Sequence, residues 1–231
     1  MLAAVAAVAA RCDAPGMQHT PPDDAQPVRF EVEYPDRDLD RVTSFFRPIT
    51  LIPIAILFSA LSGFSSGPTD VGDTTVTIAI SGVGILFLPV LLMLVFRGKY
   101  PRWWFEWNLE LQRFGNRIAA YAMLMDDRYP ATDEHQGVTL EYAYPDVDAE
   151  LSRGMPLVKW FLALPHYVAL GLLWIAAFFG VIGAWFAVLF TGRYPRGIFD
   201  FVEGVLRWHN RVIAYAFTLV TDRYPPFRLS A

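Results

Sequence analysis

The amino-acid sequence predicts a mainly α-helical, polytopic membrane protein made of two tandem repeats. The chain of 231 residues is 54% apolar and only 18% charged, whereas soluble domains contain about a quarter charged residues. Residues 48–96 and residues 160–192 contain neither Lys nor Arg. Apolar stretches of about 20 residues are long enough to span a bilayer. A basic segment also occurs twice, which is the third observation behind this fold class.

The repeated segment begins at Gly98 and again at Gly192, and the two copies align without gaps. Identical residues occupy 11 of 25 aligned positions, including Tyr-Pro-Arg, Asn-Arg and Ala-Tyr-Ala. The sequence Asp-Arg-Tyr-Pro follows each copy, at 127–130 and at 222–225. So long a match within one chain indicates an internal duplication.

A weaker match extends the duplication toward the N-terminus. Val28–Asp36 and Val138–Asp146 both alternate apolar and polar residues before Tyr-Pro-Asp, which is typical of a short strand that ends in a turn. Each unit is therefore expected to contain a short strand, a transmembrane helical hairpin and an interfacial amphipathic helix. The expected divisions are a disordered or mis-called N-terminal segment over 1–27, a first repeat over 28–131 and a second repeat over 138–228.

In the first repeat, the apolar region is divided into two candidate spans. These cover about 45–64 and 74–96, and the polar, turn-rich segment 65–73 separates them. The connecting segment contains Asp70 and Asp73 but no basic residue. We therefore expect a helical hairpin whose loop lies outside the cell.

In the second repeat, the apolar region 157–191 is nearly unbroken. One helix of that length would be about 50 Å long, beyond a hydrocarbon core of roughly 30 Å. We therefore expect two spans, at about 157–176 and 178–191, with a tight turn near Gly180–Gly183. The last span is short enough to be re-entrant.

The charge distribution predicts a multi-pass protein of the cell (cytoplasmic) membrane with both termini in the cytoplasm. Basic residues cluster after each apolar region, and cytoplasmic segments are enriched in Lys and Arg. Two hairpins in the same orientation would be related by an axis along the membrane normal. A single crossing in the second repeat would export six arginines: Arg193, Arg196, Arg207, Arg211, Arg223 and Arg228.

Amphipathic helices are predicted at about 102–125 and 196–219. Apolar residues such as Trp104, Trp107 and Phe114 recur at helical spacing, opposite charged residues. We expect these helices to lie flat at the headgroup level, where Trp and Tyr are common. The alternative is that they pack beneath the cytoplasmic strands.

Basic residues next to aromatic residues form the candidate contacts with lipid or with a protein partner. Arginines near the membrane surface attract anionic headgroups, and Tyr anchors at the interface. A purely structural role for these turns, with Pro ending the helix, is the alternative. His166 is included because an ionisable residue in a span is a functional candidate, although it could simply cap the helix end. The candidate residues are Arg102, Arg128, Tyr129, His166, Arg193, Tyr194, Arg196, Arg223 and Tyr224.

No catalytic, cofactor-binding or metal site is predicted. The four histidines are scattered, Cys12 is the one cysteine, and no phosphate-binding or nucleophile motif is present. The net charge of −4 gives no indication of a nucleic-acid partner. The expected partners are membrane lipids, with anionic headgroups among them, and a protein partner or a second copy of the chain.

The second repeat resembles the bacterial membrane family called the domain-of-unknown-function 4389 family. In the first repeat Ile54 replaces His166, so that copy departs from the pattern. The resemblance implies a membrane location and a doubled unit, and it implies no activity. The motifs that carry it are Leu164-Pro165-His166-Tyr167, Thr191-Gly192-Arg193-Tyr194-Pro195, Phe199-Asp200-Phe201, Arg207-Trp208 and Asp222-Arg223-Tyr224-Pro225-Pro226-Phe227.

Together these features predict a non-enzymatic membrane protein, namely a scaffold, an accessory subunit or a lipid-interacting module. The alternative is a small transporter or channel built from parallel repeats, although no charge relay is visible in the spans. A lipid enzyme that uses Asp200 or Glu203 with His209 is less favoured, because His209 is no direct helical neighbour of either carboxylate.

Overall fold

The fold is mainly helical, as the sequence predicts. A computed structural model describes residues 27–61, 65–71, 74–80, 82–132, 136–147, 151–152 and 154–230, so the expected N-terminal segment 1–27 lies outside the described residues except for its last position. In chain order the elements are β1 (Val28–Val32), α2 (Arg41–Leu61), β2 (Ser65–Val71), β3 (Thr74–Ile80), α3 (Gly82–Leu92), the π-helical η1 (Met93–Arg97), α4 (Arg102–Ala122), β4 (Val138–Tyr142), α6 (Pro156–Leu162), α7 (Leu164–Thr191) and α8 (Arg196–Ala216).

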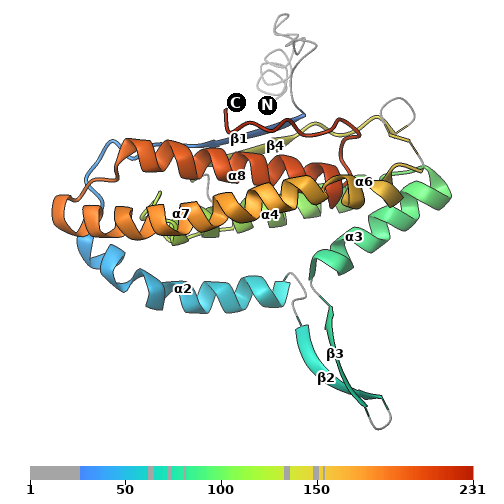
Figure 1. Ribbon diagram of the computed structural model, residues 1–231, viewed down its shortest axis with the longest axis horizontal. Coiled ribbons are helices and arrows are strands. Elements are labelled where there is room, and N and C mark those ends of the chain that lie inside the picture. The colour runs from blue at the N-terminus through green and yellow to red at the C-terminus, as the bar shows by residue number, and fades with distance from the viewer. Residues whose placement is uncertain are drawn as a thin grey trace, which may run out of the picture.

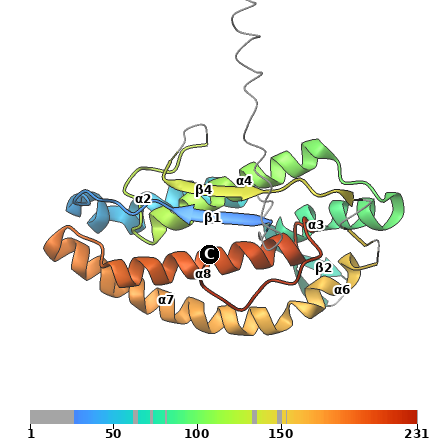
Figure 2. The same cartoon turned by 90° about the horizontal axis from the view of Figure 1, so that it is seen from above.

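The elements form three layers (Figure 1). Strands β1 and β4 form a two-stranded sheet, and helices α4 and α8 pack beneath it. On the other side of this helix pair, α2 packs on α4 and α7 packs on α8, and α2 also contacts α7. Figure 2 shows α7 running alongside α8 with the sheet beyond it. We call α2, α6 and α7 the outer helix layer.

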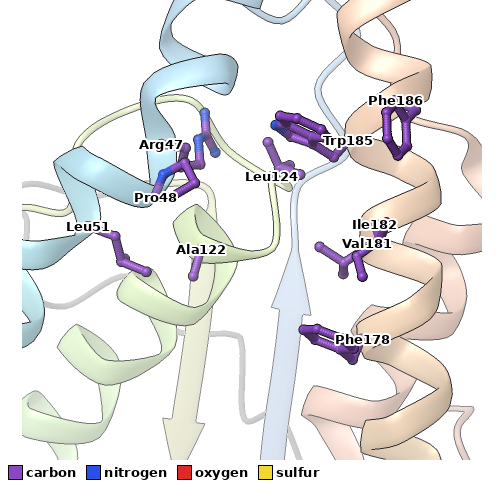
Figure 3. Close-up of a pocket in the computed structure, with 10 residues that line it drawn as sticks. All are labelled: Arg47, Pro48, Leu51, Ala122, Leu124, Phe178, Val181, Ile182, Trp185 and Phe186. Carbon is purple, nitrogen blue, oxygen red and sulfur yellow. The ribbon is translucent and has the colours of Figure 1, made fainter.

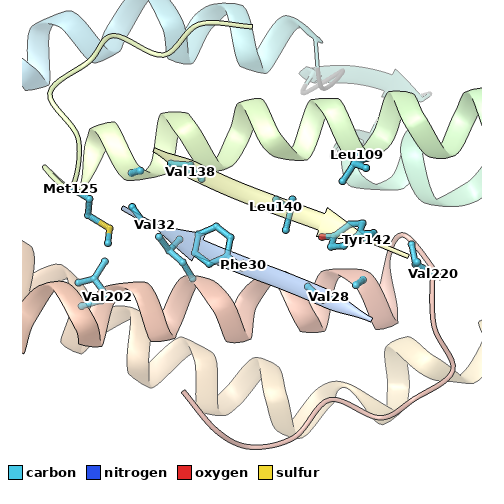
Figure 4. Packing of buried hydrophobic residues seen from close by; sticks show 14 of the residues in the cluster. Val28, Phe30, Val32, Leu109, Met125, Val138, Leu140, Tyr142, Val202 and Val220 are labelled. Atoms are coloured by element: carbon cyan, nitrogen blue, oxygen red, sulfur yellow. The ribbon is translucent and has the colours of Figure 1, made fainter. Parts of the chain in front are cut away.

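The sheet is antiparallel and centred on the pair Phe30 and Leu140. Side chains alternate between the two faces of a strand, so Val28, Phe30 and Val32 are buried while Arg29 and Glu31 point to solvent. Figure 4 shows the inward side chains of both strands lying between α4 and α8. The short strands that the alternation predicts are confirmed, and each repeat supplies one of them.

Helices α4 and α8 are joined by a reciprocal pair of asparagines. Asn116 Nδ2 donates to Asn210 Oδ1 at 2.9 Å, and Asn210 Nδ2 donates to Asn116 Oδ1 at 2.8 Å. Both side chains are buried. The two residues are 94 positions apart, which is also the offset between the two copies of the repeated segment.

Each of these helices is also tied to the sheet by an arginine. Arg113 Nε donates to the Leu140 carbonyl at 2.8 Å, and Arg207 Nε donates to the Phe30 carbonyl at 3.0 Å. The two arginines occupy matching positions of the repeated segment. Each reaches the central residue of the strand from the other half of the chain, so the halves are interlocked rather than stacked.

Glycine is required at the two positions where the repeated segment begins. Gly98 and Gly192 have φ angles of 58° and 77°, in the left-handed region that side chains disfavour. Gly192 ends α7, and its amide donates to the Val188 carbonyl at 2.8 Å. This arrangement is a common helix C-terminus. The identical glycines of the two copies therefore mark identical turns.

The expected span 74–96 is wrong in its first part. Thr74–Ile80 is a strand that pairs with Ser65–Val71, the segment expected to be a simple loop. The sequence Thr-Thr-Val-Thr-Ile-Ala-Ile is rich in β-branched residues, which favour strands. Only the later part, in α3 and η1, is helical.

The expected pair of spans in the second repeat is also wrong. Residues 164–191 form one helix of 28 residues with no turn at Gly180–Gly183. Isolated glycines weaken a helix by about 1 kcal/mol each but do not end it, and no proline follows Pro165 until Pro195. The short preceding helix α6 is separated from α7 by Ala163.

The expected helices 102–125 and 196–219 begin where predicted and end at Ala122 and Ala216. Most of their apolar side is covered, since α8 packs against β1 and α7, and α4 against β4 and α2, but Trp107 of α4 remains 44% exposed. Packing beneath the strands, which was the alternative, is what the structure shows. The apolar faces of these helices therefore pack mainly against other elements of the protein.

The asparagine pair predicts strong coupling between the two halves. Replacing Asn210 by Leu leaves the Asn116 amide buried without its partner, which should lower the free energy of unfolding by about 1–3 kcal/mol. The double variant Asn116→Leu/Asn210→Leu should lose less than the sum of the single variants, because no unpaired amide remains. Denaturant unfolding in detergent, followed by Trp fluorescence, measures both. Additive losses would contradict the coupling.

Candidate functional site

Large apolar side chains of the outer helix layer are exposed rather than packed. On α7, Leu172 is 67% exposed, Phe179 is 66% exposed and Phe190 is 77% exposed. Monomeric soluble proteins rarely present so large an apolar surface. Further exposed members on α2, α6 and α7 are Val42, Phe45, Phe46, Ile49, Ile52, Ile56, Leu57, Leu157, Val158, Trp160, Phe161, Leu162, Leu164, Val168, Ile175, Phe178, Ile182 and Phe186.

Two of the described helices are long and apolar enough to cross a membrane. They cover Arg41–Ala60 and Leu164–Thr191, and only 17% of the most apolar window of each is buried. A core helix of a soluble protein would be mostly buried. The opposite face of the molecule is polar, since Arg29 and Glu31 on the sheet have side chains 70% and 62% exposed.

The predicted contact residues do not meet in one site. Arg193, Tyr194 and Arg196 lie together at the C-terminal end of α7. Arg193 pairs with Asp38 at 3.1 Å and Arg196 pairs with Asp36 at 3.3 Å, so these exposed arginines already have carboxylate partners.

Tyr194 is not free to reach a headgroup, because it is only 2% exposed. Its carbonyl accepts a hydrogen bond of 2.6 Å from the Tyr34 hydroxyl, and its ring makes an edge contact with Phe199. The Arg196 guanidinium lies 4.0 Å from the centre of the Tyr34 ring. This group of residues therefore joins α7 and α8 to the segment that follows β1.

Arg102, Arg128 and Tyr129 are separate from that group. Arg102 pairs with Glu106 at 3.4 Å, and both side chains are exposed. Arg128 pairs with Asp126 at 2.8 Å, and this hydrogen bond raises the Arg128 pKa. Tyr129 is 50% exposed. Exposed ion pairs of this kind contribute about 0–1 kcal/mol.

His166, Tyr224 and Arg223 lie at the other end of α7. His166 is fully buried, and its Nδ1 accepts a hydrogen bond of 3.0 Å from Trp208 Nε1. Its ring stacks on Phe227 at 4.0 Å and contacts Tyr224 at 4.8 Å. These contacts hold the C-terminal segment against α7 and α8, so His166 has a structural role in this packing. Arg223 is exposed.

Two buried cations were not singled out from the sequence, although they lie within the expected spans 45–64 and 157–176. They are Arg47 on α2 and Lys159 on α6, which are 3% and 0% exposed. The sequence indicates no charge relay in these spans, because one basic residue near the end of a span changes its mean hydropathy very little. The signal was a parallel in the sequence, since Arg47 precedes Pro53 by six residues and Lys159 precedes Pro165 by six.

Lys159 has a carboxylate partner inside the protein. Its Nζ lies 2.6 Å from Asp222 Oδ1 and donates to the Thr221 carbonyl at 2.8 Å. Burial lowers the Lys159 pKa, while the hydrogen bond and the charge of Asp222 raise it. The ammonium also lies 5.3 Å from the centre of the Tyr215 ring. A buried charge is tolerated when it is paired in this way.

Arg47 is held differently. Its Nη1 donates to the carbonyls of Tyr121 and Asp126 at 2.7 and 2.6 Å, and its guanidinium lies 4.3 Å from the centre of the Tyr121 ring. Within the described part of the chain, Nε and Nη2 have no hydrogen-bond partner. The nearby carboxylate of Asp126 pairs with Arg128 and Arg37 instead.

Arg47 lines a groove of about 420 Å³ between α2 and α7. Figure 3 shows Arg47, Pro48 and Trp185 at one end of the groove and Phe178 at the other. Its volume falls within the roughly 300–1,000 Å³ typical of ligand sites. The lining residues are Arg47, Pro48, Leu51, Ala122, Leu124, Phe178, Val181, Ile182, Trp185 and Phe186, of which Arg47 alone is charged.

A comparison with protein families gives a match to the C-terminal part of the chain. Residues 155–228 match the model of a family described as Domain of unknown function (DUF4389). The resemblance predicted from the motifs of the second repeat is thereby confirmed. The match includes α6, α7, α8 and the pair Lys159–Asp222. No curated protein and no solved structure matches the chain.

The Lys159–Asp222 pair makes a direct prediction about stability. Replacing Asp222 by Asn leaves a buried ammonium without a counter-charge, which should cost about 3–5 kcal/mol of unfolding free energy. The double variant Lys159→Met/Asp222→Asn should recover most of this loss. As a matched control, Asp38→Asn removes an exposed pair and should cost less than about 1 kcal/mol. Denaturant unfolding in detergent measures all three, and equal losses for Asp222→Asn and Asp38→Asn would contradict the prediction.

Proposed function

We propose that this chain is a non-enzymatic membrane protein that inserts its outer helix layer into a lipid bilayer and serves as a lipid-interacting module or scaffold. The observation that carries the proposal is the separation of surfaces. Exposed apolar side chains gather on α2, α6 and α7, while the sheet on the other side of the molecule carries exposed charges. A surface divided in this way fits the boundary between hydrocarbon and water.

The outer layer is proposed to lie along the membrane rather than across it. α7 runs beside α8 and along the sheet (Figures 1 and 2). If α7 crossed the bilayer, Arg29 and Glu31 would enter the hydrocarbon, at about 2.5–3.5 kcal/mol for each central charge. The outer edges of the two-stranded sheet would also leave backbone groups unpaired in lipid. Insertion along the plane avoids both costs.

This orientation replaces the four crossings expected from the sequence and keeps the expectation that both ends share one side. The described chain begins at residue 27, whose carbonyl accepts from the Ala143 amide beside the sheet. It ends near Ser230, whose carbonyl accepts from Arg211. Both ends lie on the side of the sheet (Figure 1), which we assign to the cytoplasm.

The two repeats are proposed to be related by a pseudo-two-fold axis that passes through the sheet and runs along the membrane normal. Two observations support this. The Asn116–Asn210 contact joins residues at matching positions, and the antiparallel register pairs Phe30 with its counterpart Leu140. A symmetric interface within one chain resembles that of a homodimer. The open edges of the sheet are the surface we assign to a protein partner or a second copy.

Membrane attachment predicts the effect of charges on α7. Replacing Ile175 or Phe179 by Glu puts a carboxylate on the exposed apolar face and should reduce the fraction of protein that floats with phospholipid vesicles after detergent removal. Thr139→Glu, on the exposed face of the sheet, is the matched control and should float like the wild type. The proposal fails if the wild-type chain does not float, or if the α7 variants float as well as the control.

Insertion along the plane predicts the labelling of the two ends of the outer layer. In a Cys12→Ser background, cysteines in place of Ser152 and Arg193 lie near opposite ends of the α6–α7 segment. Both should react with a membrane-impermeant maleimide from the same side of sealed vesicles, together with Thr139→Cys on the sheet. Labelling of Ser152→Cys and Arg193→Cys from opposite sides would instead show that α7 crosses the membrane.

A further inference from the structure

The matching positions of Arg47 and Lys159 have different electrostatic surroundings. Lys159 is neutralised by Asp222. Around Arg47, Asp126 and Asp127 are turned toward Arg37 and Arg128, and within the described residues Arg47 forms no ion pair. The charges of Asp126 and Asp127 still act on Arg47 from a distance, but a buried guanidinium without a direct ion pair is costly. An anion that reached it from outside the protein would recover part of that cost.

The unpartnered atoms of Arg47 have the geometry of an anion site. Nε and Nη2 lie on one edge of the planar guanidinium, and this edge can donate two parallel hydrogen bonds to two oxygens of a phosphate or carboxylate. Protein atoms cover both nitrogens in the empty groove, so the side chain must turn toward the groove to bind. This movement separates no ion pair of Arg47 among the described residues, and its cost is the weakening of the Nη1 hydrogen bonds to the carbonyls of Tyr121 and Asp126.

The rest of the groove fits hydrocarbon. Between Arg47 and Phe178 the walls come from aliphatic and aromatic side chains of α2 and α7 (Figure 3). These two helices belong to the outer layer, so the groove opens where the proposed function puts lipid. Trp185 closes the Arg47 end, because its Nε1 donates to the Ser44 carbonyl at 3.0 Å and joins α7 to α2.

We propose that this groove binds one acyl chain of an anionic phospholipid, whose acidic headgroup pairs with Arg47. The inference rests on the proposed function and deepens it, because it names the lipid class and the residue that selects it. Basic pockets between membrane helices are known to hold acidic headgroups. The single cation at one end of an apolar groove matches an amphiphile with one charged end, and a zwitterionic lipid would bring a second positive group to Arg47.

The test compares lipid retention by the full-length protein purified in mild detergent. After incubation with equal amounts of phosphatidylglycerol and phosphatidylcholine, native mass spectrometry should find the wild type with one bound phosphatidylglycerol. Arg47→Gln should lower phosphatidylglycerol binding about tenfold or more, as expected for the loss of a charged hydrogen-bonding partner. Ala122→Phe, which fills the groove beside Arg47, should lower the binding of both lipids. Arg29→Gln removes an exposed arginine of the sheet, far from the groove, and should bind like the wild type.

Thermal unfolding of each variant without added lipid shows whether it is folded, and Ala122→Phe keeps the test decisive if Arg47→Gln unfolds. The inference is overturned if the wild type does not prefer phosphatidylglycerol, if Arg47→Gln keeps the wild-type preference, or if Ala122→Phe binds as much of both lipids as the wild type. Vesicle flotation separates this result from a failure of the proposed function. If the wild type and the variants float equally and the variants bind lipid like the wild type, the lipid site alone is overturned. A wild-type chain that does not float overturns membrane attachment itself.

Discussion

The contact between α4 and α8 is the constraint on which the other layers depend. Asn116 and Asn210 satisfy each other there, and each also donates to a carbonyl four residues earlier in its own helix. A buried amide pair tolerates little sliding, since any shift leaves donors unpaired. The helices are thus fixed in register. The sheet is laid across them on one side, and α2 and α7 are laid against them on the other.

In the proposed orientation, this middle layer keeps the buried charges of the chain away from the lipid. Arg113 and Arg207 donate to strand carbonyls, while Arg117 and Arg211 donate to carbonyls of the segments that follow each helix. Burial, together with the charges of Arg228 and Arg207, lowers the pKa of Arg211 to about 10, which leaves it protonated at neutral pH. These arginines of α4 and α8 therefore have their hydrogen-bond partners in the sheet and the loops, and not in the outer helix layer.

The sequence was enough to predict the duplication of motifs, the strands and the starts of both middle helices, because these depend on local patterns. The expectations for α7 and for Thr74–Ile80 failed for different reasons. The length limit on α7 assumed that the helix crosses the bilayer, but a helix lying along a surface has no such limit. For Thr74–Ile80, the prediction of a span relied on the apolar character of the segment and gave too little weight to its β-branched residues, which favour a strand. The surroundings of Arg47 could not have been predicted, because its carbonyl partners come from the end of α4 and from the loop after it.

Arg47 and Lys159 differ in their partners, and in the proposed lipid site this difference gives the first unit a binding role that the second unit lacks. Both positions keep a buried cation above a tyrosine of the middle layer, so the cation itself belongs to the common architecture. In the second unit, Asp222 closes the charge balance internally. In the first unit, Asp127 pairs with Arg37 and the neighbouring Asp126 pairs with Arg128. A buried charge is stable only with a partner. Because these carboxylates pair with other arginines, Arg47 can pair with an external anion on the face where the apolar groove lies.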